Sequence, residues 1–191
     1  MKIIKSKIFK LITASLIIGL ILGIIYFIFI DKKELESSII NYITLIKNND
    51  YNYIKGLTLS ISSNLKYSSI IWISGIIFFC SLIIPLIIIY RGISLSITLS
   101  SIIYTFKLKG LLYALIIAIP NIINEIIFLF LSYYSITFSI KCFNTIKNNK
   151  DINLRQFIKN YFYIFIILSF LLIISSLIEI YLCSNIIKFV V

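Results

Sequence analysis

The stretch Arg91–Ile140, RGISLSITLSSIIYTFKLKGLLYALIIAIPNIINEIIFLFLSYYSITFSI, decides the fold of this chain. It is almost continuously apolar. The few groups that interrupt it are Arg91-Gly92, Lys107–Gly110, Pro120-Asn121 and Glu125. In a membrane such residues separate spans or form buried polar contacts, because lipid supplies no hydrogen-bond partners. We therefore predict a central membrane block at 91–140, with breaks at 107–110 and 120–121.

Composition places the whole chain in a membrane. Hydrophobic residues make up 60% of the 191, charged residues only 13%, and the mean hydropathy is +1.06. A soluble domain would have about a quarter of its residues charged. Apolar runs of about 20 residues can cross the hydrocarbon core, and the chain has several. The composition predicts an all-α, polytopic transmembrane helical bundle in contact with membrane lipids.

Charge and missing residue types exclude several functions. The net charge of +11 is spread over end segments and loops, which is typical of an orientation signal rather than of nucleic-acid binding. The chain has no histidine, which excludes Ser-His-Asp and Cys-His catalytic centres and His-ligated metals. The three cysteines are far apart, at Cys80, Cys142 and Cys183. We expect no catalytic residue, no cofactor and no metal ligand.

The first apolar run, residues 11–30, is predicted to be an uncleaved span. It is longer than the hydrophobic region of a signal peptide, which is about 7–15 residues, and no small-residue cleavage site follows it. Gly19 and Gly23 form a G-x-x-x-G pair within it. This spacing either lets another helix approach closely or arises by chance.

Residues 31–67 form the only sizeable polar segment, and we expect it to be helical and extracytoplasmic. Apolar residues recur there at helical spacing, at Leu35, Ile39, Ile43 and Ile46. This stripe either rests on the bilayer as part of a tether or binds a partner protein. The four residues are therefore candidate docking residues.

The remaining apolar runs give about five spans. We predict the second span at 68–90, ended by Arg91 on the cytoplasmic side, and the last at 161–182. Residues 93–106 cover only about 20 Å as a helix and could be re-entrant, which would give four spans. The basic loop at 141–159 favours five, with the amino end cytoplasmic and the carboxyl end outside.

Four short motifs stand out along the chain: Arg91-Gly92-Ile93-Ser94-Leu95, Phe106-Lys107-Leu108-Lys109-Gly110, Ile119-Pro120-Asn121 and Ser176-Leu177-Ile178-Glu179-Ile180-Tyr181. In this order and spacing they resemble the stage II sporulation protein M family. The resemblance covers nearly the whole chain, although the family pattern has a glycine where this chain has Ser96. We expect packing roles for Gly92, Ser96 and Gly110, because small residues allow helices to approach closely.

The resemblance implies a non-enzymatic membrane component of the engulfment machinery of spore-forming bacteria. Members of this family sit in the mother-cell membrane at the sporulation septum. There they hold two peptidoglycan-degrading partners, an amidase/endopeptidase (stage II sporulation protein P) and a lytic transglycosylase (stage II sporulation protein D). A homo-oligomer is left open.

Two carboxylates keep a second function class open, that of a small membrane transporter or channel component. Glu125 lies in the middle of a span, where an ionised carboxylate is costly unless it is paired or faces water. Asn121 is four residues earlier, on the same helical face. Glu125 is either a structural, hydrogen-bonded group or part of a proton or solute path. Glu179, near the outer end of the last span, is interpreted as an interfacial anchor or outer contact.

Overall fold

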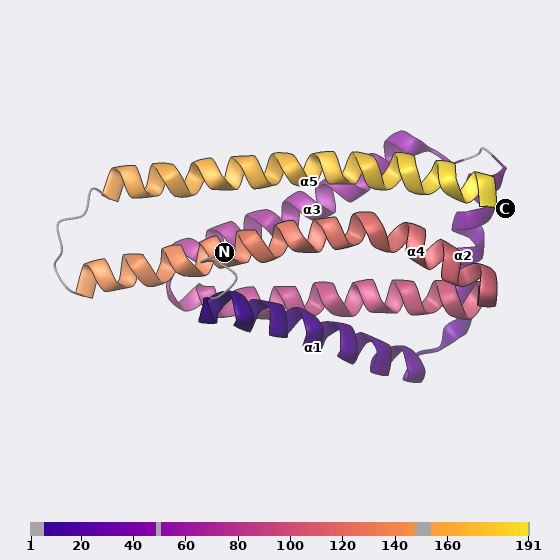
Figure 1. The fold of residues 1–191 in the computed structure, drawn as a ribbon, viewed down its shortest axis with the longest axis horizontal. Helices are drawn as coiled ribbons and strands as arrows, with labels where there is room; N and C mark the ends of the chain where they lie inside the picture. Colours follow the sequence, from indigo (N-terminus) through magenta and orange to yellow (C-terminus); the bar gives the residue numbers. More distant parts are fainter. Residues whose placement is uncertain (1–5, 49–50, 148–153, 191) are drawn as a thin grey trace.

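The computed structural model describes residues 6–48, 51–147 and 154–190. It contains no strand within these ranges, so the prediction of an all-α bundle is confirmed. The helices, shown in Figure 1, are α1 (Lys7–Phe29), α2 (Lys32–Lys47), α3 (Tyr53–Ile76), the short 3-10 helix η1 (Phe79–Leu82), α4 (Ile83–Lys147) and α5 (Leu154–Val190).

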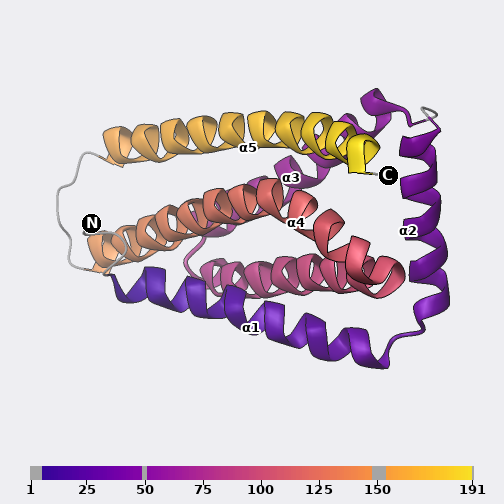
Figure 2. The same ribbon diagram turned by 45° about the vertical axis from the view of Figure 1, so that its right-hand side comes forward.

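Helix α4 is a hairpin of two limbs that lie side by side (Figure 2). The chain reverses at Lys107, which has φ 51° and ψ −122° and is the one non-helical residue inside α4. Gly110 lets the limbs meet after this corner, because a Cβ there would lie 2.9 Å from the Cα of Ile103. The predicted break at 107–110 therefore matches the corner of the hairpin.

The first limb, residues 83–106, replaces the predicted second span. That span, at 68–90, is wrong, because α3 ends at Ile76 and α4 begins at Ile83. At about 1.5 Å per residue the limb is about 36 Å long, and residues 93–106 are its second part. This length favours the five-span prediction over the alternative in which 93–106 is re-entrant. Arg91 consequently lies inside a limb. Residues 68–90 are apolar throughout, so hydropathy could not show the reversal between them.

The predicted break at Pro120-Asn121 is absent, and α4 continues through it. A proline inside a helix lacks the N–H group that would bond the preceding turn. Here the side chain of Asn121 donates from Nδ2 to the carbonyl oxygen of Ile117 at 2.9 Å. In addition, the Ser175 hydroxyl lies 3.5 Å from the Pro120 carbonyl oxygen, as a long hydrogen bond from α5. The carbonyl that loses its helical N–H partner is that of Ile116, four residues before the proline. The two side-chain bonds go to neighbouring carbonyls of the same segment.

The corner at Lys107 yields a stability prediction. A positive φ with this ψ is strained for any residue except glycine, at a cost of about 1–3 kcal/mol. Lys107→Gly should therefore raise the free energy of unfolding by about 1 kcal/mol, less than the strain itself because glycine is more flexible when unfolded. Chemical unfolding of the purified protein in detergent micelles measures this. Lys109→Gly, in the helix after the corner, is the control and should be destabilising; a loss of stability in both variants would contradict the prediction.

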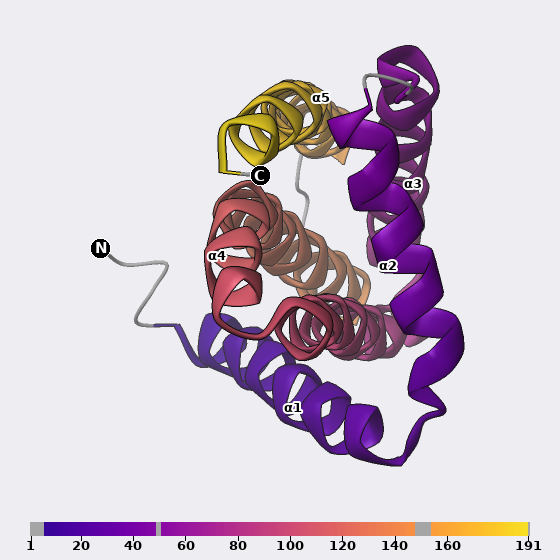
Figure 3. The ribbon, with the colours of Figure 1, turned by 90° about the vertical axis from the view of Figure 1, so that its right-hand side faces the viewer.

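The limbs pack around one apolar core. Helix α1 lies along the first limb of α4, while α3 and α5 pack against α4 and each other. Helix α2 crosses one end of the bundle, as the end-on view in Figure 3 shows. The buried core residues come from α1, α3, both α4 limbs and α5: Ile12, Ile71, Ile84, Ile88, Ile127, Phe128, Leu129, Leu131 and Leu172.

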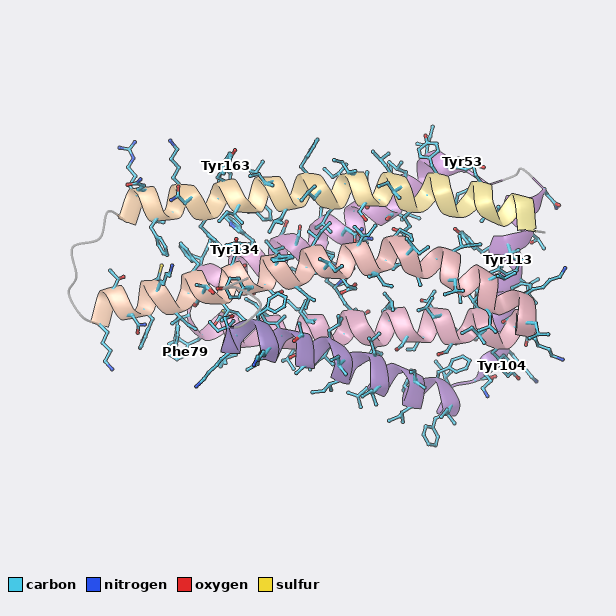
Figure 4. All side chains as sticks on the ribbon, viewed as in Figure 1. Tyr53, Phe79, Tyr104, Tyr113, Tyr134 and Tyr163 are labelled. Carbon is cyan, nitrogen blue, oxygen red and sulfur yellow. The ribbon has the colours of Figure 1, made fainter. Side chains whose placement is uncertain are left out.

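The outer surface is that of a membrane protein. Three stretches are long and apolar enough to cross a membrane, at Lys7–Phe29, Phe79–Thr145 and Arg155–Tyr181. Most of their side chains face outward: at most 44% of the most apolar window of each is buried inside the bundle. Figure 4 shows Tyr53 and Tyr104 near the α2 end, and Phe79, Tyr134 and Tyr163 towards the other. Aromatic residues at both ends are typical of proteins that contact both membrane interfaces.

The two hydrophobic limbs of α4 lie within a single one of these stretches. With α1 and α5 they give four apolar limbs along the bundle, and α3 runs beside them. Helix α3 is less apolar and is not among the three stretches. The count of five spans therefore stays a prediction, although the path of the chain is compatible with it.

Candidate functional site

The centre of the bundle holds an ion pair between the two limbs of α4. Arg91 Nη2 lies 2.8 Å from Glu125 Oε1, and Arg91 Nε donates to the same oxygen at 2.9 Å. The side chains are only 11% and 8% exposed. Both residues were singled out from the sequence, but Arg91 as the end of a span and Glu125 as a carboxylate in the middle of another. Once Arg91 lies inside a limb, a buried charge needs an opposite charge nearby, and Glu125 supplies it.

Three further groups hold Arg91 in place. Its Nη1 and Nη2 atoms lie 3.5 Å from Asn64 Oδ1 on α3, at the limit of hydrogen bonding. Its guanidinium carbon is 3.7 Å from the ring centre of Phe128, a cation–π contact with the second limb of α4. It is also 5.5 Å from the ring centre of Tyr67 on α3. Arg91 thus connects α3 with both limbs of α4.

Hydrogen bonds extend this polar centre to α5. Asn64 Nδ2 donates to Ser176 Oγ at 3.0 Å, and the Ser176 hydroxyl donates to the Leu172 carbonyl in its own helix. One turn further along α5, Glu179 Oε2 accepts from Ser60 Oγ of α3 at 2.9 Å. Glu179 therefore faces into the bundle, which corrects its interpretation as an outer anchor. Ser60, Asn64 and Ser176 were not predicted as site residues.

These polar groups line a cavity of about 500 Å³ between the helices. The hairpin of α4, α3 and α5 form its walls, and Ser38, Ile39, Tyr42 and Ile43 of α2 contribute at the end of the bundle. Charged and amide side chains share the lining with aliphatic ones. The polar lining residues include Ser60, Asn64, Arg91, Asn121, Asn124, Glu125 and Glu179.

Among the residues that the structure describes, two buried acceptors at this cavity have no hydrogen-bond partner. They are Asn124 Oδ1 and Glu125 Oε2. Asn124 is 1% exposed, and the other carboxylate oxygen of Glu125, Oε1, accepts from Arg91. The Asn121 and Asn124 side chains line the same cavity as Glu179. Two carboxylates, one guanidinium and three amides therefore meet inside an otherwise apolar bundle.

Helix α1 approaches the first limb of α4 through small residues. A Cβ on Gly19 would collide with the backbone of Ile89, and one on Gly23 would collide with Ser96 Oγ. From the other side, a Cβ on Gly92 would lie 2.8 Å from the Leu16 carbonyl oxygen. Thus the G-x-x-x-G pair on α1 faces Gly92 and Ser96 on α4. This seam fixes the limb that carries Arg91.

Helix α2 uses its apolar stripe to attach to the rest of the protein. Ile43 and Ile46 are 5% and 0% exposed, and they pack with Ile102 and Tyr113 of the α4 hairpin. Ile39 joins this cluster, and Leu35 is half-buried. The stripe is thus covered by the chain itself, which corrects its interpretation as a free docking surface. An apolar stripe has the same spacing whether it contacts its own chain or a partner.

A family comparison agrees with the arrangement of motifs around this centre. The family model for Stage II sporulation protein M matches residues 12–184. The chain belongs to this family. The match begins within α1 and ends within α5, so it includes every residue of the polar centre. It confirms the resemblance seen in the sequence. No curated protein and no solved structure gives a significant match to the chain.

In this stage II sporulation protein M, the polar centre joins α3, α4 and α5 through side-chain contacts. Within the described part of the chain, no group of three or more His, Cys, Asp or Glu residues is placed to hold a metal ion. Arg91, on the first α4 limb, contacts groups on α3 and on the second limb, and Ser60 and Asn64 connect α3 with α5. A buried pair of this kind specifies one helix arrangement, because any other would leave a charge unpaired in lipid.

Proposed function

We propose that this protein is a non-enzymatic membrane scaffold of the sporulation engulfment machinery. It anchors peptidoglycan-degrading partners at the septal membrane. The observation that carries this proposal is the family match over residues 12–184. By resemblance, the partners are stage II sporulation proteins P and D, and the location is the mother-cell membrane.

The end of the bundle crossed by α2 is the surface on which we place these partners. Because the apolar stripe of α2 is attached to α4, its opposite side faces outward. Ser37, Ile40, Asn41 and Thr44 are exposed there, and Ile40 keeps 42% of its surface accessible. The inward stripe therefore fixes the helix, and the outward side is left for contact with a partner.

A co-purification experiment tests this placement. Ile40→Asp puts a charge into the outward surface of α2 without touching the core, and it should abolish co-purification of the two cell-wall hydrolases. Ile158→Asp, on an exposed position at the start of α5, is the control and should leave recruitment unchanged. The proposal fails if the hydrolases do not co-purify with the unaltered protein. Normal recruitment by Ile40→Asp would remove α2 as the docking element.

The distribution of positive charge supports a cytoplasmic amino end. The beginning of α1, the end of α4 and the beginning of α5 lie towards the same end of the bundle (Figure 1). They bring together Lys7, Lys10, Lys141, Lys147, Arg155 and Lys159. Positive residues flanking spans favour the cytoplasmic side. In this orientation α2 and the carboxyl end lie outside.

Cysteine labelling tests the orientation. In a background whose three native cysteines are replaced with serine, Thr44→Cys on α2 should react with a membrane-impermeant maleimide added to intact cells. Asn144→Cys, exposed near the end of α4, should react only after the membrane is permeabilised. Labelling of Asn144→Cys in intact cells would reverse the proposed orientation.

The Arg91–Glu125 pair favours the structural interpretation of Glu125 over a transport path. A relay group must release its partner, whereas Glu125 Oε1 accepts two bonds from one buried guanidinium. Asn121, the neighbour expected from helical spacing, instead donates to the Ile117 carbonyl oxygen. The scaffold therefore remains the function that we propose.

A further inference from the structure

We propose that the cavity between α3, α4 and α5 binds a small organic molecule with a primary ammonium group. The lining of this cavity includes Asn124, Glu125 and Glu179 together with aliphatic, aromatic and hydroxyl side chains. This inference does not depend on the scaffold function, because it rests on the cavity alone.

The charges that line the cavity do not balance. Arg91 is its one cationic lining residue, and it faces two carboxylates, Glu125 and Glu179. Arg91 binds Glu125 directly, whereas Glu179 accepts from the neutral hydroxyl of Ser60. Within the described ranges no cation lies at ion-pair distance from Glu179. Because a net negative charge is costly inside an apolar bundle, the site favours a cationic ligand.

The two buried cavity atoms that have no partner would both be satisfied by a ligand with hydrogen-bond donors. Asn124 Oδ1 and Glu125 Oε2 are both acceptors, and both are buried without a partner. Asn124 is adjacent to Glu125 in the chain, and both line the same cavity as Glu179. The three acceptor groups are therefore neighbours. A primary ammonium has three N–H donors and one positive charge, so it can satisfy all three.

The size and lining of the cavity favour an organic ammonium over a bare ion. A volume of about 500 Å³ lies in the range of small-molecule sites, about 300–1,000 Å³. Beyond the carboxylates the walls are formed by Leu95, Leu99 and Ile117, with Tyr42 and Tyr67 as aromatic neighbours. An alkyl or aryl body would bury its apolar surface against these residues while its ammonium group faces Glu179.

Three matched probes test the proposal on the full-length protein in detergent micelles. The probes are n-hexylammonium chloride, n-hexyltrimethylammonium chloride and 1-hexanol, measured by isothermal titration calorimetry. The trimethyl compound keeps the charge but has no N–H donor, and the alcohol has no charge. We expect saturable binding of hexylammonium, at least about tenfold tighter than that of either comparator, since hydrogen bonds to charged groups are worth that much.

Two variants locate the site. Glu179→Gln should weaken hexylammonium binding by at least about tenfold, because it removes the excess negative charge. Glu34→Gln removes a carboxylate that is exposed on α2 and should leave the affinity unchanged. Equal affinity for the three probes, or no saturable binding, would overturn the proposal. So would unchanged binding by Glu179→Gln; if that variant does not fold, the comparison of probes on the unaltered protein decides.

Discussion

Replacing Arg91 with methionine should destabilise the folded bundle by roughly 3–5 kcal/mol, the largest effect of any single substitution that we predict. The reason is that the substitution leaves Glu125 unpaired. Glu125, with a side chain only 8% exposed, would keep its charge without a counter-charge in an apolar surrounding. Thermal and chemical unfolding of the purified protein in detergent micelles measure the loss.

The double variant Arg91→Met/Glu125→Met separates loss of pairing from loss of packing. It removes both charges while keeping similar side-chain volume, so it should regain at least half of the lost stability. Arg155→Met, on an exposed position at the start of α5, is the matched control and should have little effect. If Arg91→Met proves no more damaging than Arg155→Met, the ion pair does not hold the limbs together.

Gly19→Leu should also unfold or displace α1, with a loss of about 2–3 kcal/mol. At this position even a Cβ would meet the carbonyl oxygen and Cα of Ile89 on α4, which are backbone atoms and cannot rotate away. Forcing bulk into such a contact separates the helices or strains them. The change would shift the first α4 limb and, with it, Arg91.

A leucine at Ala14 is the control for Gly19→Leu. Ala14 lies on the exposed side of the same helix, where a larger apolar side chain would face lipid. Ala14→Leu should therefore unfold at the same temperature as the unaltered protein. Similar unfolding temperatures for Gly19→Leu and Ala14→Leu would mean that the small residues on α1 do not form the contact seen here.

The candidate site was predicted as a set of residues but not as a set of contacts. Arg91, Asn121, Glu125 and Glu179 stood out because charged and amide groups are rare within the apolar runs. Their partners did not, since Asn64 and Ser60 lie in a segment where polar residues are ordinary. The pairing of Arg91 with Glu125 was missed for a definite reason. The apolar run at 68–90 was interpreted as one span ended by Arg91, which put Arg91 at a membrane surface.

A different division of that run would have found the pair. Pro85 is compatible with the first turn of a helix, where its missing N–H has no partner to lose. A limb starting near it places Arg91 well inside, and a charge there requires an opposite charge on another helix. Glu125 and Glu179 were the candidates. That a buried charge needs an opposite charge follows from the sequence, but the position of the turn between α3 and α4 does not.

Composition and apolar run length by themselves determined that this chain is an all-α membrane protein, because backbone polar groups in lipid must bond within helices. The order of short motifs determined its family. Only the tertiary structure decided where the helices reverse, which limb faces which, and that the apolar stripe of α2 covers its own chain. The physical reason is that hydropathy records the preference of each segment for lipid or water. Pairing between distant segments depends on shape and charge, at the glycines of α1 and the Arg91–Glu125 pair, and these act only when the helices meet.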